Sequence, residues 1–148
     1  MTTNSPLPFV PSSEERLKTM IGLAAILQGQ KAADLGSGDG RVVIALAKEG
    51  AEAHGFEIDY KLVNEARKKI HEEGLENKAF IHNLDFFKVD LSNFDILTIY
   101  GITSIMSPLE EKLRSELKSG AKVISNFFTF PNWGHEVKVS EVYLYRQP

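Results

Sequence analysis

Apolar and polar positions along this chain follow two periods, and the alternation between them predicts an α/β domain. Apolar residues spaced three or four apart predict helices after Ser12, over 41–49, after Asp59 and after Ser107. Short apolar runs predict strands at 31–36, 51–58, 77–84, 94–100 and 121–130, with one or two more within 137–147. Strands that alternate with helices of this length form a mostly parallel sheet with helices on both faces.

Helix boundaries are predicted from capping residues. Ser12 and Glu15 have the spacing of a capping box, and the apolar series behind them runs to Leu27. Ser107 followed by Pro108 predicts the start of the last helix, because proline is favoured in a first turn. No helix separates the final strands, so we expect six to seven strands, with an antiparallel strand at the C-terminal end.

Composition limits the chemistry further. A chain of 148 residues fits a single domain, 1–148, in which the proline-rich stretch 1–12 is extended rather than helical. The absence of cysteine excludes disulfides and thiolate chemistry, and the four histidines lack metal-ligand spacing, so no metal is expected. A net charge of -3 disfavours nucleic acid as a partner. Without a signal peptide or a long apolar run, we expect a cytoplasmic monomer with no membrane contact.

The clearest chemical signal is a glycine-rich turn between the first strand and the second helix. It reads Asp34-Leu35-Gly36-Ser37-Gly38-Asp39-Gly40-Arg41. Glycines let a ligand approach the backbone, and a helix N-terminus behind them offers free N–H groups. Glu57 closes the second strand, where an acid commonly binds a ribose diol. The turn therefore predicts a site for a nucleoside-bearing ligand.

Two common nucleotide motifs do not fit this turn. A dinucleotide fingerprint would need glycine where the chain has Arg41, and no Gly-Lys-Ser/Thr follows, as a P-loop requires. The remaining pattern, acid-x-Gly-x-Gly-x-Gly, resembles motif I of class I S-adenosylmethionine-dependent methyltransferases. That resemblance implies a Rossmann-like fold, S-adenosylmethionine as cofactor and S-adenosylhomocysteine as product.

A closer resemblance covers most of the chain. Its segments PFVPSSEE, ADLGSGDGRVVIALAK, GFEID and NLDFFKVDLSNFD are similar to the small archaeal protein lysine methyltransferases and to the family-with-similarity-173 enzymes. The resemblance implies a protein partner that carries the acceptor lysine. It also implies cofactor contacts from a set of residues at the ends of the first three strands: Asp34, Gly36, Ser37, Gly38, Gly40, Glu57, Ile58, Asp85 and Phe86.

Methyl transfer from a sulfonium needs an oriented, neutral amine in an apolar channel rather than a general base. We expect Phe9 and Tyr100 to line that channel, because one lies in the proline-framed segment and the other ends the fourth strand. The resemblance places segment 1–12 over the active site. Candidates for substrate contact are Val10, Pro11, Ser12 and Trp133.

The family pattern usually reads Pro-Tyr-Val-Pro-Thr at the N-terminal segment, where this chain has Phe9 and Ser12. The tyrosine hydroxyl of relatives is therefore missing. The loop after the fourth strand lacks the Asn/Asp-Pro-Pro-Tyr sequence of adenine and glutamine methyltransferases. Three interpretations stay open: a protein lysine methyltransferase, a methyltransferase for a small molecule or RNA, and a catalytically silent cofactor-binding module.

Overall fold

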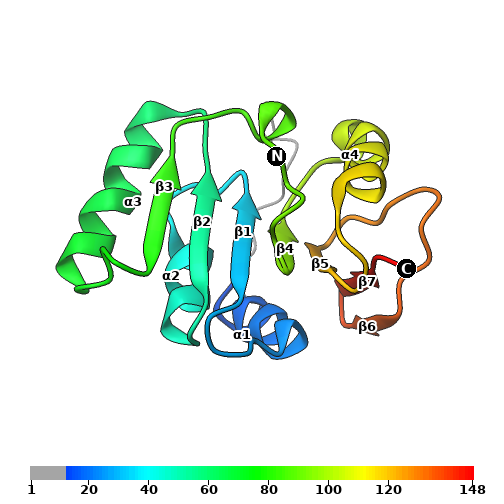
Figure 1. Cartoon of the computed structure of the whole chain (residues 1–148), viewed down its shortest axis with the longest axis horizontal. Coiled ribbons are helices and arrows are strands. Elements are labelled where there is room, and N and C mark those ends of the chain that lie inside the picture. Colours follow the sequence, from blue (N-terminus) through cyan, green and yellow to red (C-terminus); the bar gives the residue numbers. More distant parts are fainter. Residues whose placement is uncertain (1–12) are drawn as a thin grey trace.

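The computed structural model describes residues 13–148, and these residues form one seven-stranded sheet flanked by helices (Figure 1). The helices are α1 (Ser13–Ala24), α2 (Arg41–Lys48), α3 (Tyr60–Glu72) and α4 (Thr103–Glu116), with a 3₁₀ turn η1 (Phe86–Lys88). The strands are β1 (Lys31–Leu35), β2 (Glu52–Phe56), β3 (Ala79–His82), β4 (Ile96–Ile99), β5 (Lys122–Asn126), β6 (Val137–Val139) and β7 (Val142–Arg146). The expected extended segment 1–12 lies outside the described residues.

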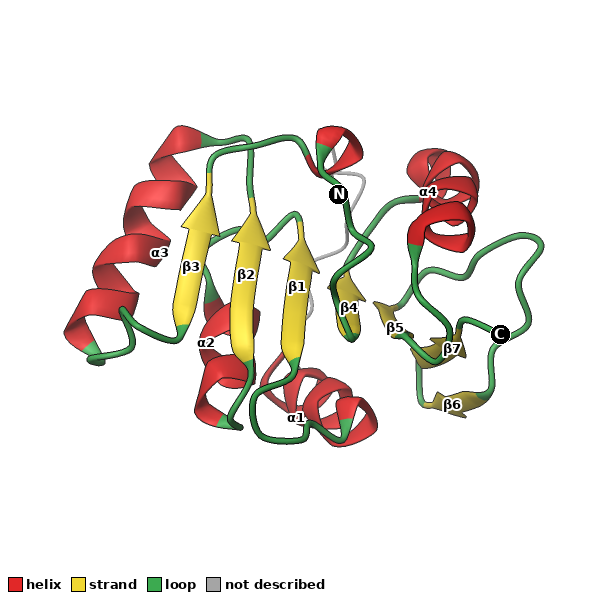
Figure 2. Cartoon of the chain, in the orientation of Figure 1, coloured by secondary structure: helices red, strands yellow, loops and turns green. Residues whose placement is uncertain are grey.

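The strand order in the described chain is β3-β2-β1-β4-β5-β7-β6. Strands β1 to β5 are parallel to their neighbours, and β7 is antiparallel to both β5 and β6. Figure 2 shows β1, β2 and β3 side by side and pointing the same way. The predicted mostly parallel sheet with an antiparallel C-terminal strand is confirmed, and 137–147 supplies two strands.

Helices cover both faces of the sheet, as predicted, and each face has its own core. Helices α1, α2 and α3 pack on one face through buried residues such as Met20, Val43 and Ala66. Helix α4 packs on the other face, where Leu109 and Leu113 are fully buried. Alternate residues of the central strands point into the two cores, so β1, β4 and β5 belong to both.

The helices on either side of β2 begin where the sequence predicts. Helix α2 follows Gly40, and helix α3 follows Asp59, whose side chain accepts a hydrogen bond from the Lys61 backbone N–H at 2.9 Å. Both helices start beyond the carboxyl ends of parallel strands. Their N-termini therefore lie at the edge of the sheet where α/β proteins bind ligands.

The predicted start of the last helix is wrong. Helix α4 begins at Thr103, four residues before Ser107, and Pro108 lies inside it. Met106 in the first turns is 2% exposed, and burial in the core on that face extends the helix backwards past its local start signal. Pro108 is tolerated close to the N-terminus because few backbone hydrogen bonds are lost there.

Two further elements are shorter than the sequence indicates. Helix α1 ends at Ala24, since Ala25 has φ 45°, and Leu27 beyond it is 68% exposed. Strand β5 ends at Asn126 rather than near residue 130, because Phe127 has φ 82°. An apolar run shows that a segment is buried, but it does not show where the backbone leaves the sheet.

Candidate functional site

The glycine-rich turn is fixed against both β2 and α3. The backbone N–H groups of Gly36 and Ser37 donate to the Phe56 carbonyl at 2.9 and 3.0 Å. Gly40 has φ 90°, and a Cβ at this position would lie 2.8 Å from the Ala66 Cβ. Only glycine fits here, because the turn needs both a left-handed backbone and close contact with α3.

A second close contact lies beneath the turn. Ser37 is buried, and a Cβ at Gly55 of β2 would lie 2.6 Å from the Ser37 Cβ. The Ser37 Oγ has no hydrogen-bond partner among the described residues. The side chain of Ser37 therefore packs against β2, and its expected cofactor contact stays a prediction.

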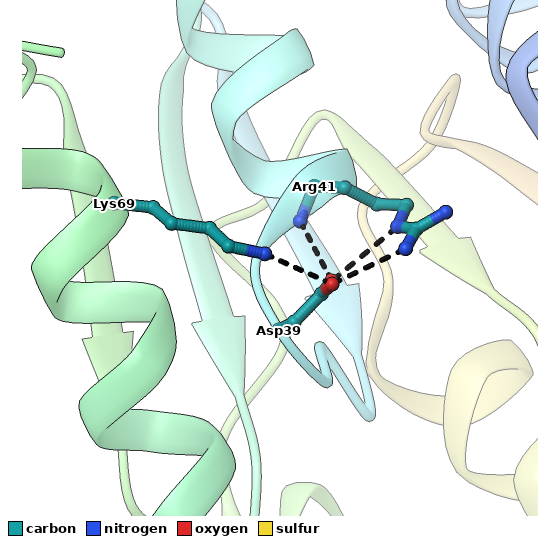
Figure 3. A network of polar contacts seen from close by, with 3 residues as sticks. All are labelled: Asp39, Arg41 and Lys69. Atoms are coloured by element: carbon teal, nitrogen blue, oxygen red, sulfur yellow. Dashed lines mark hydrogen bonds and ion pairs between the residues drawn. The ribbon is translucent and has the colours of Figure 1, made fainter.

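Charged side chains add to this attachment, as Figure 3 shows. The Asp39 carboxylate pairs with Arg41 Nη2 at 3.2 Å and with Lys69 Nζ of α3 at 3.0 Å. Partial burial raises the pKa of Asp39, but the hydrogen bonds and charges of Arg41 and Lys69 outweigh it and lower the pKa to about 2. The residue that breaks the dinucleotide fingerprint, Arg41, thus braces the turn from its exposed side.

Glu57 lies directly after β2 and faces the turn. Its Oε1 accepts a hydrogen bond from the Gly38 backbone N–H at 2.8 Å, and its Oε2 accepts one from the Asp59 N–H at 2.9 Å. These bonds fix the carboxylate between the turn and the start of α3. An ionised carboxylate has about four acceptor positions, so this one can still accept hydrogen bonds from a ligand diol.

Asp34 ends the buried part of β1 and is 5% exposed. The Thr98 hydroxyl, on the paired position of β4, donates to its Oδ1 at 2.7 Å. Burial raises the pKa of Asp34 to about 7, and the charges of Glu57 and Asp39 raise it further, against the lowering effect of the Thr98 hydrogen bond. A carboxyl of this kind changes charge near neutral pH.

An open cavity of about 290 Å³ lies at the carboxyl ends of these strands. Glu57 and Asp85 supply its carboxylates, while Ile58 and Leu84 are apolar residues left 73% and 52% exposed. Asp85 also caps η1 by accepting a hydrogen bond from the Phe87 N–H at 2.9 Å. The residues that line the cavity are Gly36, Phe56, Glu57, Ile58, Leu84, Asp85, Phe86, Phe87 and Ile105.

This lining suits the nucleoside end of S-adenosylmethionine. Apolar walls can enclose a flat base, and carboxylates can accept hydrogen bonds from a ribose diol and an exocyclic amine. Of the residues expected to bind cofactor, Gly36, Glu57, Ile58, Asp85 and Phe86 meet at the cavity. The other expected cofactor residues, Asp34, Ser37, Gly38 and Gly40, belong to β1 and the adjoining turn.

Sequence reasoning missed several residues of this site. Leu84 and Ile105 line the cavity although neither belongs to the recognised motifs. Thr98 holds Asp34, and its signal was a hydroxyl within the otherwise apolar stretch 94–100. That hydroxyl becomes meaningful only when the register between β1 and β4 is known.

The candidate acceptor residues are divided by the structure. Tyr100 follows β4 and is half-buried, and its ring centroid lies 6.3 Å from that of Phe128, beyond β5. Burial raises the pKa of the Tyr100 hydroxyl, so it stays protonated at neutral pH. Trp133 is 8% exposed and packs on Phe130 and Tyr145, away from the cavity lining. The substrate role of Trp133 therefore stays a prediction, and the structure gives this ring a packing role.

The expectations for the N-terminal segment fall on Phe9, Val10, Pro11 and Ser12, which lie outside the described residues. Within residues 13–148, no cluster of three or more acidic, histidine or cysteine side chains is placed to hold a metal ion. None of the helices in that same range is both long and apolar enough to cross a bilayer.

Comparisons with known proteins agree with this geometry. The family model described as "ANTKMT methyltransferase domain" matches residues 34–137. A protein-lysine N-methyltransferase of Saccharolobus islandicus is 34% identical, with 94% of this chain and 92% of that protein covered. A lysine N-methyltransferase of Xenopus laevis, named for the ATP synthase c-ring protein, is 39% identical over 86% of this chain and 56% of its own length.

The solved structures add the fold and one different acceptor. The crystal structure of an RNA methyltransferase from Salinibacter ruber, in complex with S-adenosyl-L-homocysteine, has a TM-score of 0.83 and 31% identity. The match covers 95% of this chain and 92% of that one. This chain spans 51–58% of the length of the vertebrate ATP synthase lysine N-methyltransferases that it matches.

Proposed function

The chain belongs to the ANTKMT methyltransferase family, and from this premise we propose that it transfers methyl groups from S-adenosylmethionine to the side-chain amine of protein lysines. The observation that carries the lysine assignment is the end-to-end match with the Saccharolobus enzyme, which has almost the same length. The cavity between Glu57 and Asp85 supports the cofactor. Both carboxylates, together with Asp34, argue against a silent binding module.

In this proposal the cofactor's nucleoside occupies the cavity. Glu57 accepts hydrogen bonds from the ribose hydroxyls, Asp85 accepts one from the adenine amine, and Ile58 packs on the base with Phe86. The turn 36–40 surrounds the methionine end, next to the carboxylate of Asp34. When bound, the cofactor supplies a methyl group already activated as a sulfonium substituent.

The protein's remaining task is to deliver a neutral amine. A free lysine has a pKa of about 10.4, so only about one in 2,500 is neutral at pH 7. Aromatic and apolar walls exclude water and thereby lower that pKa. Tyr100 and Phe128 provide such walls beside the carboxyl ends of β4 and β5, and aromatic faces also attract a methylated ammonium. Phe9 and the rest of segment 1–12 would complete the channel.

RNA is the second candidate acceptor, because the Salinibacter protein that matches nearly the whole chain is called an RNA methyltransferase. The net charge of -3 favours a protein acceptor instead. The monomeric state, the single-domain boundaries at 1–148 and the cytoplasmic location stay predictions.

A labelling experiment decides between these acceptors. The purified protein is incubated with radiolabelled S-adenosylmethionine and a lysate of its source, and the products are separated into protein, nucleic-acid and small-molecule fractions. We expect label in protein, released as methyl-lysine on hydrolysis and lost with Glu57→Ala. Label confined to RNA or to small molecules would overturn the lysine assignment and leave the cofactor assignment intact. No label in any fraction would favour the silent module.

A further inference from the structure

Phe127 has a backbone conformation that non-glycine residues rarely adopt. Its φ of 82° follows directly on the last residue of β5, Asn126, at the sheet edge that carries the site. A left-handed conformation costs free energy for a side chain with a Cβ, so other contacts must hold it. Strained backbone of this kind is frequent at functional sites.

Arg16 of α1 supplies those contacts. Its Nη1 donates to the Asn126 Oδ1 at 3.1 Å, and its Nη2 donates to the Glu141 Oε1 at 2.8 Å. The guanidinium carbon lies 5.7 Å from the centroid of the Phe127 ring. The Phe127 N–H in turn donates to the Glu141 carbonyl at 2.7 Å. One side chain therefore contacts the residue before the strained position, its ring and its backbone partner.

The fixed turn determines where the next ring lies. The Phe128 carbonyl accepts a hydrogen bond from the Ser125 hydroxyl, and the Phe127 and Phe128 ring centroids lie 5.0 Å apart in an edge-to-face arrangement. Phe128 then lies beside Tyr100, at the end of the neighbouring strand β4. A residue in ordinary extended conformation at 127 would send this ring in a different direction.

Arg16 also joins two distant parts of the chain. It is three residues from Ser13, where the described chain begins, and its side chain is only 17% exposed. The ion pair with Glu141 spans 125 positions in sequence. The start of α1 is thereby anchored to the ends of β5 and β7, and the cofactor cavity is lined by other residues.

We propose that Arg16 is a positioning residue for the methyl acceptor, which holds the Phe127 turn so that Phe128 and Tyr100 form two walls of the acceptor channel. This inference rests on the proposed transferase function. It predicts that Arg16 affects use of the acceptor and leaves cofactor binding unchanged. It also predicts that glycine at position 127 compensates for loss of Arg16, because glycine adopts this turn without strain.

The test compares Arg16→Met, the double variant Arg16→Met/Phe127→Gly and the control Arg146→Met. Arg146 makes an ion pair with Glu136 at 2.9 Å and lies at the other end of the same strand pair, opposite Lys122. The measurements are initial rates of label transfer to the acceptor fraction of the source lysate, the cofactor Kd by calorimetry, and the thermal midpoint.

We expect Arg16→Met to lower apparent kcat/KM for the acceptor at least tenfold, with the cofactor Kd within twofold of wild type. The double variant should regain at least threefold of that loss, and Arg146→Met should retain wild-type kcat/KM. Kcat/KM within twofold of wild type for Arg16→Met would overturn the inference. So would no regain in the double variant, or a parallel rise in cofactor Kd, since either result indicates general destabilisation.

Failure of the proposed function gives a different result. If the wild-type protein labels RNA, the lysine assignment fails, and the same variants are compared with RNA as the acceptor. Should Arg16→Met not fold, Arg16→Lys replaces it, because lysine keeps one cationic contact but cannot bridge Asn126 and Glu141 together. We expect Arg16→Lys to lie between wild type and full loss, and wild-type kcat/KM for this variant would overturn the inference.

Discussion

Asp34 combines burial, a titration near neutral pH and a position beside the glycine-rich turn. The charges of Glu57 and Asp39 and the hydrogen bond of the Thr98 hydroxyl all act on its carboxyl. Since the cofactor brings an ammonium and a sulfonium, the ionised form of Asp34 is the better partner. We therefore predict that cofactor affinity increases as pH rises through about 7, the pKa of this carboxyl.

Asp34→Asn tests this prediction by calorimetry at several pH values. The amide should bind cofactor more weakly at pH 8 and should remove the increase in affinity across neutral pH. Thr98→Val is a useful companion, because loss of the hydroxyl removes a hydrogen bond that lowers the pKa of Asp34. With this variant the rise in affinity should move to higher pH. An unchanged pH profile in both variants would contradict the assignment to Asp34.

The same carboxyl has a consequence for stability with a definite sign. The pKa of Asp34 is about 7 in the folded protein against 3.8 as the ordinary value, so between these values the folded state binds more protons. The contribution of this group to the free energy of unfolding therefore falls as pH rises from about 4 to 7. Asp34→Asn should flatten that part of the curve of thermal midpoint against pH.

Trp133 distinguishes a packing role from a substrate role at a single residue. The ring is buried with Phe130 and Tyr145, and the Arg114 guanidinium carbon lies 5.4 Å from its centroid. We predict that Trp133→Phe lowers stability by about 1–3 kcal/mol, in the range for an imperfectly filled core. Apparent kcat/KM for the acceptor should stay within twofold of wild type. A tenfold loss of kcat/KM without loss of stability would restore the substrate role.

At the scale of elements, the glycine-rich turn depends on α3 for its position. Lys69 of α3 reaches the Asp39 carboxylate, and Gly40 lies against Ala66 on the same helix. We predict that Lys69→Met weakens cofactor binding about two- to fivefold, the range expected for one partly exposed ion pair. Exposed Lys68 on the same helix gives the matched control, and Lys68→Met should keep the wild-type Kd.

The ion pair also has an acid limit. The pKa of Asp39 is lowered from 3.8 to about 2, so its stabilising contribution is present above about pH 4 and is lost as pH falls towards 2. Lys69→Met should therefore reduce the loss of thermal midpoint across this window, whereas Lys68→Met should not. Equal acid sensitivity in the two variants would mean that Asp39 does not brace the turn.

Elements with strong local signals were predictable from the sequence, and elements set by tertiary contacts were not. Helices α2 and α3 follow from the capping positions of Gly40 and Asp59, and the cofactor carboxylates follow from strand ends. The start of α4 was missed, since burial of Met106 outweighs the local signal at Ser107. Thr98 and Arg16 were missed because their partners are 64 or more positions away.

At the scale of the whole molecule, the two cores share the central strands. Ala32, Ile96 and Ile124 point towards α1, α2 and α3, and the next residues along, Ala33, Leu97 and Val123, point towards α4. Loss of either helical layer exposes one face of the same strands. The two layers should therefore unfold together, as expected for a single domain of this size.

Two probes report separately on the two layers. Far-UV circular dichroism follows all helices, while Trp133, the chain's single tryptophan, reports on the core beside α4. We predict coincident thermal transitions by both probes. Cofactor at 100 times its Kd stabilises the folded state by about 2.7 kcal/mol, and both midpoints should shift upward by the same amount. The shift reaches Trp133 although the cavity is lined by other residues, because β1 and β4 connect the two cores. Separate transitions, or a shift confined to one probe, would show that the layers fold independently.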